Sequence, residues 1–319
     1  MSNSKYFSLW ITCGLFVLLF IIGAIQFPAF GSLRVFSNLF TDNAFLAITA
    51  IGMTFVIISG GIDLSVGSVI ALTGVICGVL IGEYHWHPLQ VFPVVLLLGT
   101  LFGAAMGALI YYYRLQPFIV TLAGMFLARG LATTISEQSI PIDHAFYDSV
   151  ADFGFALPGN AWLGSSTMIL LLVLVVAVIF AHYTRAGAYV YACGGNAQAA
   201  QLMGVPMART TIAIYAGSSF LASLAGIVFS FYTFSGYALA GMGVELDAIA
   251  AVVIGGTLLT GGFGFVFGTL IGVLIMGVIQ TYISFDGTLN SWWTKIVIGL
   301  LLFFFIALQK VLTLKNKMT

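Results

Sequence analysis

Apolar runs of helix length dominate the chain, and short polar or glycine-rich stretches separate them. A helix that crosses a bilayer needs about 20 mainly apolar residues. Runs of about that length lie near 9–28, 43–60, 66–82, 92–113, 118–135, 166–183, 211–232, 244–260, 264–283 and 293–309. A transmembrane barrel would instead show alternating segments of about ten residues, and stretches such as MILLLVLVVAVIF (168–180) do not alternate. The pattern predicts an all-α polytopic membrane protein with about ten transmembrane helices in a single domain, 1–319.

The composition agrees with a chain that is solvated mainly by lipid. Hydrophobic residues make up 61% of the sequence and charged residues 6%, against about 25% charged residues in soluble proteins. The ten basic residues are scattered singly, which excludes the basic stripe that nucleic acid binding requires. The first apolar run, after Lys5, is longer than the core of a signal peptide, so we expect an uncleaved first span.

The positive charges predict which loops face the cytoplasm, because Lys and Arg of short loops stay on that side. An even number of spans places both termini together. Cytoplasmic termini put most of the basic residues inside: Lys5, Arg114, Arg185, Arg209, Lys310, Lys315 and Lys317. Arg34 and Lys295 then lie outside. Nine acidic residues fall at or beyond the outer face, namely Asp42, Glu83, Glu137, Asp143, Asp148, Asp152, Glu245, Asp247 and Asp286.

Two loops are long enough for a role of their own. The predicted periplasmic loop 136–165 carries four carboxylates and two prolines, and it is either a docking surface for an extracytoplasmic partner or a solvated connector. The predicted cytoplasmic loop 184–210 contains GGNAQAAQLMGVP (194–206).

The second loop carries the signals of a short, well-terminated helix. Asn196 is a good N-cap, Gly204 suits a left-handed C-terminal position, and Pro206 prevents continuation. Such a short helix is unstable alone in water, so it must lie against its own bundle or a cytoplasmic partner. The pattern also fits an ordinary connector.

Glycines recur where helices are expected to pack or to break. Spacing by four gives two helices a flat stripe for close packing, formed by Gly99, Gly103 and Gly107 and by Gly264, Gly268 and Gly272. GGIDLSVGSVIALTG (60–74) and GGFGFVFGTLIGVLI (261–275) also overlay at their glycine pairs, which suggests an internal repeat.

Few charged residues lie within the predicted spans. Broken helices beside glycines line substrate pathways in many transporters, so Asp63, Ser65 and Arg129 are candidates for a translocation pathway. Asp63 has an alternative role as a cap for the helix that follows it. Arg129, in a span, either reaches an interface or faces a partner inside the bundle, because a charge near the bilayer centre costs about 3 kcal/mol or more.

Motifs for chemistry are missing from the sequence. There is no GxxxxGK[ST] loop to hold ATP, the four histidines match no metal motif, and no nucleophile elbow is present. The spans also lack central carboxylates, which ion-coupled transporters commonly use. We therefore expect a non-catalytic transport pore without metal or catalytic residues, powered by another subunit.

Three stretches resemble the permease subunits of bacterial sugar ABC importers of the ribose and galactose type. They are AIGMTFVIISGGIDLSVGSV (50–69), GGNAQAAQLMGV (194–205) and ELDAIAAVVIGGTLLTGGFGFVFGTLIGVLI (245–275). Three further segments, 34–48, 136–142 and 281–296, are similar to members of this family that import galactofuranose. The resemblance implies that cargo, with ribose or another aldose as the alternative.

The resemblance also implies partners and a location. They are a second, related permease, a cytoplasmic ABC ATPase that uses ATP and Mg²⁺, and a periplasmic sugar-binding protein, in the bacterial inner membrane. The family's coupling helix falls on Asn196, Ala199, Ala200 and Gly204. Other ABC groups have Glu-Ala-Ala here, whereas this chain has Gln198 before its two alanines, so a contact that needs the carboxylate is in doubt. An ion-coupled secondary transporter remains the competing class.

Overall fold

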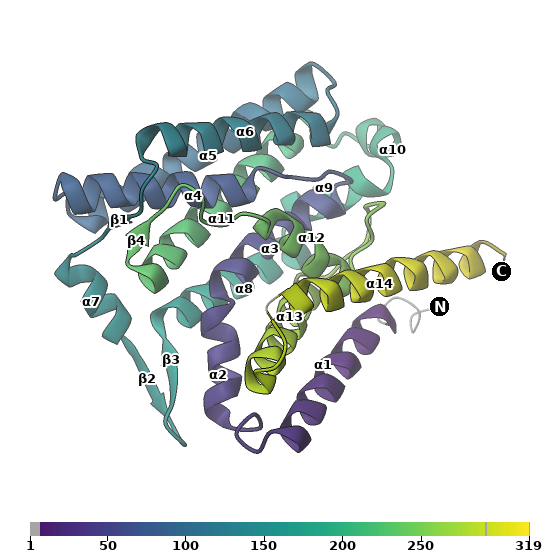
Figure 1. Ribbon diagram of the computed structural model, residues 1–319. Helices are drawn as coiled ribbons and strands as arrows, with labels where there is room; N and C mark the ends of the chain where they lie inside the picture. The colour runs from purple at the N-terminus through teal and green to yellow at the C-terminus, as the bar shows by residue number, and fades with distance from the viewer. Residues whose placement is uncertain (1–6, 291, 319) are drawn as a thin grey trace.

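The computed structural model describes residues 7–290 and 292–318 and shows a mostly helical protein (Figure 1). The helical class is confirmed. Lys5 lies outside the described residues, as do the side chains of Lys310, Lys315 and Lys317. The elements of the first half are α1 (Phe7–Gln26), α2 (Leu33–Asp42), α3 (Ala44–Ile58), α4 (Val66–Cys77), the π-helical turn η1 (Gly78–Glu83), α5 (Pro88–Tyr112), α6 (Pro117–Ile135) and β1 (Ile140–Pro141).

The second half begins with a small extramembrane unit and returns to long helices. Its elements are α7 (Ala145–Asp152), β2 (Gly154–Leu157), β3 (Ala161–Gly164), α8 (Ser165–Tyr183), α9 (Arg185–Gly195), α10 (Ala197–Leu202), α11 (Met207–Thr233), β4 (Ser235–Gly236), α12 (Val244–Ile254), α13 (Val266–Asp286) and α14 (Trp292–Met318). The strands form two antiparallel pairs, β1 with β4 and β2 with β3. They are too short to change the fold class.

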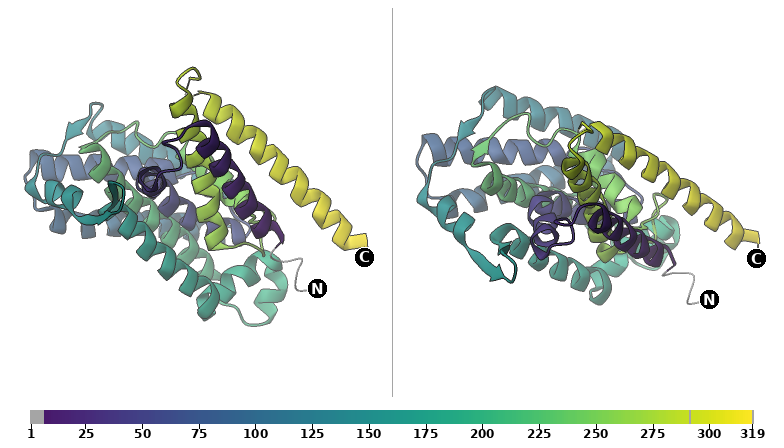
Figure 2. Two further views of the ribbon diagram at one scale, coloured as in Figure 1. Left: turned by 90° about the horizontal axis from the view of Figure 1, so that it is seen from below. Right: turned by 60° about the horizontal axis from the view of Figure 1, so that its bottom comes forward.

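The molecule has two distinct ends. The α10 end carries α9, α10 and the loops after α3 and α12, whereas the hairpin end carries α7 and the β2–β3 hairpin (Figure 1). Figure 2 shows that the start of α1 and the end of α14 lie on the side of α10. The predicted loops 184–210 and 136–165 thus occupy opposite ends of the bundle.

Seven helical segments of the described chain are long and apolar enough to cross a membrane: α1, α4 with η1, α5, α6, α8, α11 and α13. The pair α2 and α3, bent by 56°, supplies an eighth if it counts as one span. All the predicted runs overlap helices, but the run at 244–260 is wrong as a helical span. At 1.5 Å per residue, α12 is about 17 Å long, against a hydrocarbon core of about 30 Å.

A non-helical segment precedes α12 and lengthens its path. Residues 234–243, which consist of β4 and turns, leave the hairpin end and run along α4, with Gly236 against Gly74 and Gly241 against Gly67. Those two α4 glycines are seven residues apart, about 10 Å along a helix, so this segment and α12 together form one broken span. Phe234 ends α11 in the left-handed region at φ 49°, and the chain reverses there.

The core lies where α3, α12 and α13 meet. Their facing side chains are almost all aliphatic and fully buried, as Ile51, Val252 and Ile275 are. At the hairpin end the buried Tyr147 packs into a second cluster, and its hydroxyl lies 3.0 Å from Ser230 Oγ on α11. This contact fastens α7 to the transmembrane bundle.

Candidate functional site

The short helix α10 forms as its sequence predicts. The Asn196 side chain accepts a hydrogen bond of 2.9 Å from the Ala199 amide, and Gly204 turns the chain away at φ 82°. Ala200 is fully buried, whereas Leu202 is 90% exposed and Met203 75% exposed. One side of α10 thus packs on the protein, and its last turn presents two large apolar side chains that a partner could cover.

Helix α9 connects α10 to two helix breaks. The Gly262 amide donates a hydrogen bond of 2.8 Å to the Ile58 carbonyl, and a Cβ on Gly194 would overlap both groups. Tyr191 reinforces the contact by donating 3.0 Å to the Gly264 carbonyl. The ends of α3 and α9 and the loop between α12 and α13 therefore meet without intervening side chains, and we call this meeting point the glycine junction.

Both glycine pairs of the suggested repeat belong to the glycine junction. Gly261 lies so close to Gly60 that an added Cβ would sit 3.0 Å from the Gly60 Cα. The chain continues from these pairs into α4 and α13 respectively. A displacement of α10 would consequently reach the starts of two membrane helices. The repeat itself stays a prediction.

Asp63 and Ser65 lie in the break before α4, and both are fully buried. One Asp63 oxygen accepts from the Ser65 amide at 3.0 Å and from its hydroxyl at 2.6 Å. The other accepts from Ser218 Oγ on α11 at 2.8 Å. The carboxylate therefore orders the first turn of α4, where a negative charge is favourable, and ties that turn to α11.

Arg129 faces the bundle interior from α6 and holds the broken span. One guanidinium nitrogen, Nη1, donates 2.5 Å to the Ala238 carbonyl and 2.7 Å to the Ala240 carbonyl. Both carbonyls belong to the non-helical segment 234–243 and therefore have no donor from a helix of their own. Irregular backbone at membrane depth persists only where such groups are satisfied. Arg129 donates the hydrogen bonds that these two carbonyls need.

Helix α6 supports the other break in the same way. The hydroxyl of Thr121, two turns before Arg129, donates to the Pro117 carbonyl of its own helix at 2.9 Å and lies 3.3 Å from the Ile62 carbonyl beside Asp63. One helix thus contacts both non-helical segments through polar groups. The arrangement makes α6 a brace for the two broken parts of the bundle.

Glu245, predicted at or beyond the outer face, packs inside the bundle. Its Oε2 is buried without a hydrogen-bond partner among the described residues and lies where a Cβ on Gly67 would be. Arg129 is near enough to interact with it electrostatically. Asp247, two residues on, instead forms an ion pair of 2.6 Å with Lys295. The depth of Glu245 in the membrane stays a prediction.

The predicted glycine stripes lie at helix contacts. Gly99, Gly103 and Gly107 on α5 face α11, where an added Cβ would collide with Ser223, Tyr215 and Ile212 respectively. Gly268 and Gly272 on α13 face α12 in the same manner, whereas Gly264 lies two residues before α13 begins.

No group of three metal-ligating side chains comes together in the described part of the chain. His87 and His144 instead cap α5 and α7, accepting from the Leu89 and Phe146 amides.

Sequence reasoning missed four of the polar groups that organise this site: Tyr191, Ser218, Thr121 and Glu245. Ser218 follows Gly217 and precedes Ser219 within an otherwise apolar run, and such polar residues in a span are a usable signal. Tyr191 and Thr121 have no comparable signal, because aromatic and threonine residues are common in helices of any role.

Comparison with known proteins gives a consistent result. Residues 35–306 match the family described as branched-chain amino acid transport system, permease component. The chain is 59% identical to the inner membrane ABC transporter permease protein YjfF of Escherichia coli (strain K12), over 96% of this chain and 92% of that protein.

Two further relatives are named as sugar permeases. The fructose import permease protein FruG of Bifidobacterium longum (strain NCC 2705) is 40% identical, over 93% of this chain and 88% of that protein. The ribose import permease protein RbsC of Escherichia coli (strain K12) is 38% identical, over 89% and 87%. No solved structure matches the chain. The resemblance to ABC importer permeases is confirmed, and the chain belongs to this family of ABC transporter permease components.

Proposed function

We propose that this chain is the transmembrane permease of an importer that moves a monosaccharide into the bacterial cytoplasm. The fructose and ribose import permeases among its relatives support a sugar as cargo. The chain contributes the membrane pathway and carries no catalytic residues. Its location is the inner membrane, as in the name of its relative YjfF.

The observation that carries the proposal is the connection of α10, through α9, to the glycine junction. A subunit that is driven by a cytoplasmic ATPase needs a rigid connection between the helix that binds the ATPase and the membrane helices that open and close the pathway. Here α10 exposes Leu202 and Met203 to a partner, and α9 passes any displacement through Gly194 to the starts of α4 and α13. Asn196, Ala199, Ala200 and Gly204 are the proposed coupling residues.

The partners of this permease follow from that role. An ABC ATPase binds α10 and hydrolyses ATP with Mg²⁺, a periplasmic sugar-binding protein delivers cargo at the hairpin end, and a second, related permease completes the pore. Arg185 and Arg209 flank α9 and α10, and Arg114 lies in the loop between α5 and α6, which supports a cytoplasmic α10. Both termini then lie in the cytoplasm.

Galactofuranose is the proposed cargo, on the basis of the segments 34–48, 136–142 and 281–296. Ribose or another aldose is the alternative. The pathway candidates Asp63, Ser65 and Arg129 act in this proposal through the backbone: they hold the two breaks in place, and the gate moves when those breaks move. The competing mechanism is ion-coupled secondary transport.

Uptake of labelled sugars by the complete reconstituted complex tests the substrate. We expect ATP-dependent accumulation of a furanose such as galactofuranose, with pyranose sugars competing poorly. Preferential accumulation of ribose would assign the alternative cargo. Absence of accumulation for any monosaccharide, with ATP hydrolysis intact, would refute sugar import.

A further inference from the structure

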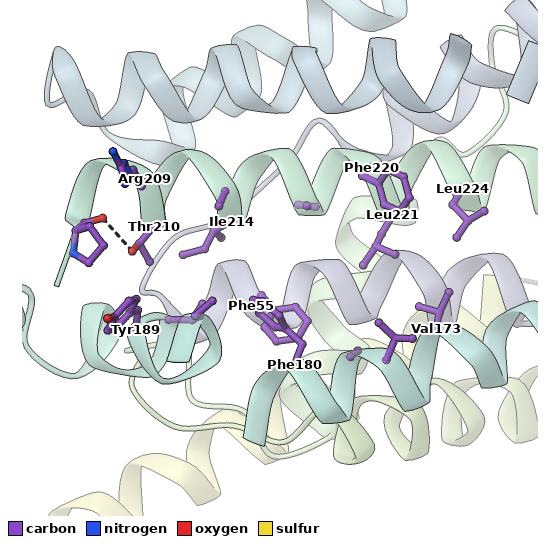
Figure 3. Close-up of a pocket in the computed structure, with 18 of the residues that line it drawn as sticks. Phe55, Val173, Phe180, Tyr189, Arg209, Thr210, Ile214, Phe220, Leu221 and Leu224 are labelled. Atoms are coloured by element: carbon purple, nitrogen blue, oxygen red, sulfur yellow. Dashed lines mark hydrogen bonds between the residues drawn. The ribbon is translucent and has the colours of Figure 1, made fainter. Parts of the chain in front are cut away.

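An apolar groove of about 660 Å³ runs along the surface between α8, α9 and α11, with α3 as its floor (Figure 3). Leu172 and Val176 on α8 and Phe220 on α11 line it and are 65%, 57% and 38% exposed. The groove is therefore open to whatever surrounds these membrane-spanning helices.

The groove has one polar end. Arg209 and Tyr189 lie at one end, on opposite walls of the groove, whereas Phe220, Leu224 and Val173 lie toward the other end (Figure 3). The distance from Arg209 to Leu224 along α11 is about 22 Å, somewhat more than the depth of one leaflet of a hydrocarbon core of about 30 Å. The groove therefore suits a ligand with an anionic head and a long apolar body.

The remaining polar side chains of the groove are already engaged. Ser218 donates to Asp63, and Thr210 donates to the Pro206 carbonyl at 3.0 Å. A sugar would find no free hydroxyl proton along the apolar length to pair with its oxygens, which disfavours this groove as part of the cargo pathway. Arg209 is exposed, and no acidic side chain pairs with it in the described part of the chain.

The occupant that matches a long apolar groove with a basic end is a flexible hydrocarbon chain with an anionic head, because basic pockets between membrane helices bind anionic lipid headgroups.

We propose that this groove binds one anionic phospholipid, with its phosphate at Arg209 and an acyl chain along α8 and α11. Tyr189, which has an apolar ring and a polar hydroxyl, stands at the level of the headgroup. The bound lipid fills the space beside the Ser218–Asp63 contact and stiffens the packing of α9 on α11. The inference does not depend on the identity of the cargo.

Lipid binding to the purified full-length protein, measured by native mass spectrometry, tests the proposal. The probes are dioleoyl phosphatidylglycerol and dioleoyl phosphatidylcholine, which share acyl chains and differ in net charge. A basic residue near the membrane surface contributes about 1 kcal/mol toward anionic lipid, so we expect about fivefold tighter binding of phosphatidylglycerol.

Two substitutions with matched controls test the lipid headgroup contact and the acyl-chain contact separately. Arg209→Ala removes the fivefold preference, whereas Arg185→Ala, an equally exposed arginine outside the groove, retains it. Gly217→Leu fills the groove, because a Cβ at Gly217 meets nothing within 4 Å, and it weakens binding of both lipids. Gly14→Leu, at another open glycine on α1, leaves both unchanged.

Three results would overturn the proposal. The first is equal affinity of the wild type for the two lipids, and the second is an unchanged preference in Arg209→Ala. The third is a Gly217→Leu protein that binds lipid normally but loses a second copy of the chain, which would assign the groove to subunit contact.

Discussion

Removing the N-cap of α10 should loosen this helix in a predictable manner. The Asn196 side chain holds the Ala199 amide at 2.9 Å, and Asn196→Ala leaves that amide without its acceptor. Loss of an N-cap costs about 1 kcal/mol, which corresponds to a factor of about five in an equilibrium constant. Because α10 has six residues, no remaining interior turns compensate for the loss.

Hydrogen exchange measured by mass spectrometry on the peptide that covers 196–205 reads this change directly, because exchange reports local opening. We expect the amides of this peptide to exchange about fivefold faster in Asn196→Ala. Asn196→Asp is the matched control, since Asp is an equally good N-cap, and it should exchange at the wild-type rate. Peptides from α13 should be unaffected in both variants.

The same pair of variants tests the proposed role of α10. ATP-driven uptake by the complete complex should fall in Asn196→Ala and stay near the wild-type level in Asn196→Asp. Unchanged exchange in Asn196→Ala would show that the packing of Ala200 alone holds the helix. Faster hydrogen exchange together with full sugar uptake would show that α10 is a connector and does not couple the ATPase to transport.

Three other predictions concern the bundle. Arg129→Met leaves two carbonyls of the broken span without their donor. The two hydrogen bonds from the charged group contribute about 1.5–3 kcal/mol each, which outweighs the roughly 3 kcal/mol cost of placing a charge in a span. The midpoint of thermal unfolding in detergent should therefore fall, and a rise would contradict the bracing role. Gly103→Ala forces a methyl group against the Tyr215 carbonyl and should cost about 1–3 kcal/mol, whereas Gly14→Ala should cost nothing by the same unfolding measurement; equal stability of both variants would remove the close contact of α5 with α11. A cysteine at the exposed Asp148 should react with an impermeant thiol reagent from the periplasm, and labelling only from the cytoplasm would invert the orientation.

Local signals were sufficient for α10. Its cap, its terminal glycine and its following proline act within about ten residues, so the sequence alone predicts where the helix begins and ends. The long apolar runs likewise predict the spans, since every backbone group in lipid must be paired within its own helix.

The broken span could not be found in the same way. A hydropathy window assumes helical backbone throughout, whereas residues 234–243 consist of a two-residue strand and turns. The segment therefore resembles a glycine-rich loop in the sequence although it runs along α4. Its carbonyls are satisfied by Arg129, more than a hundred positions away, and only the folded structure brings them together.

The contacts of the glycine junction were hidden for a related reason. The pairs at Gly60 and Gly261 are visible in the sequence, and they suggested breaks and a repeat. Their contact with Gly194 is tertiary, because it joins the ends of α3 and α9 to the loop between α12 and α13, which are far apart along the chain. The functional reading of α10 depends on that contact.

The dependence of sugar uptake on a separate ATPase tests the central claim most directly. Labelled sugar accumulation would be compared between liposomes that contain the complete complex with ATP on the α10 side and liposomes that contain this chain alone under an imposed proton or sodium gradient. The account predicts accumulation only in the complete complex with ATP. Accumulation by the chain alone on an ion gradient would contradict it.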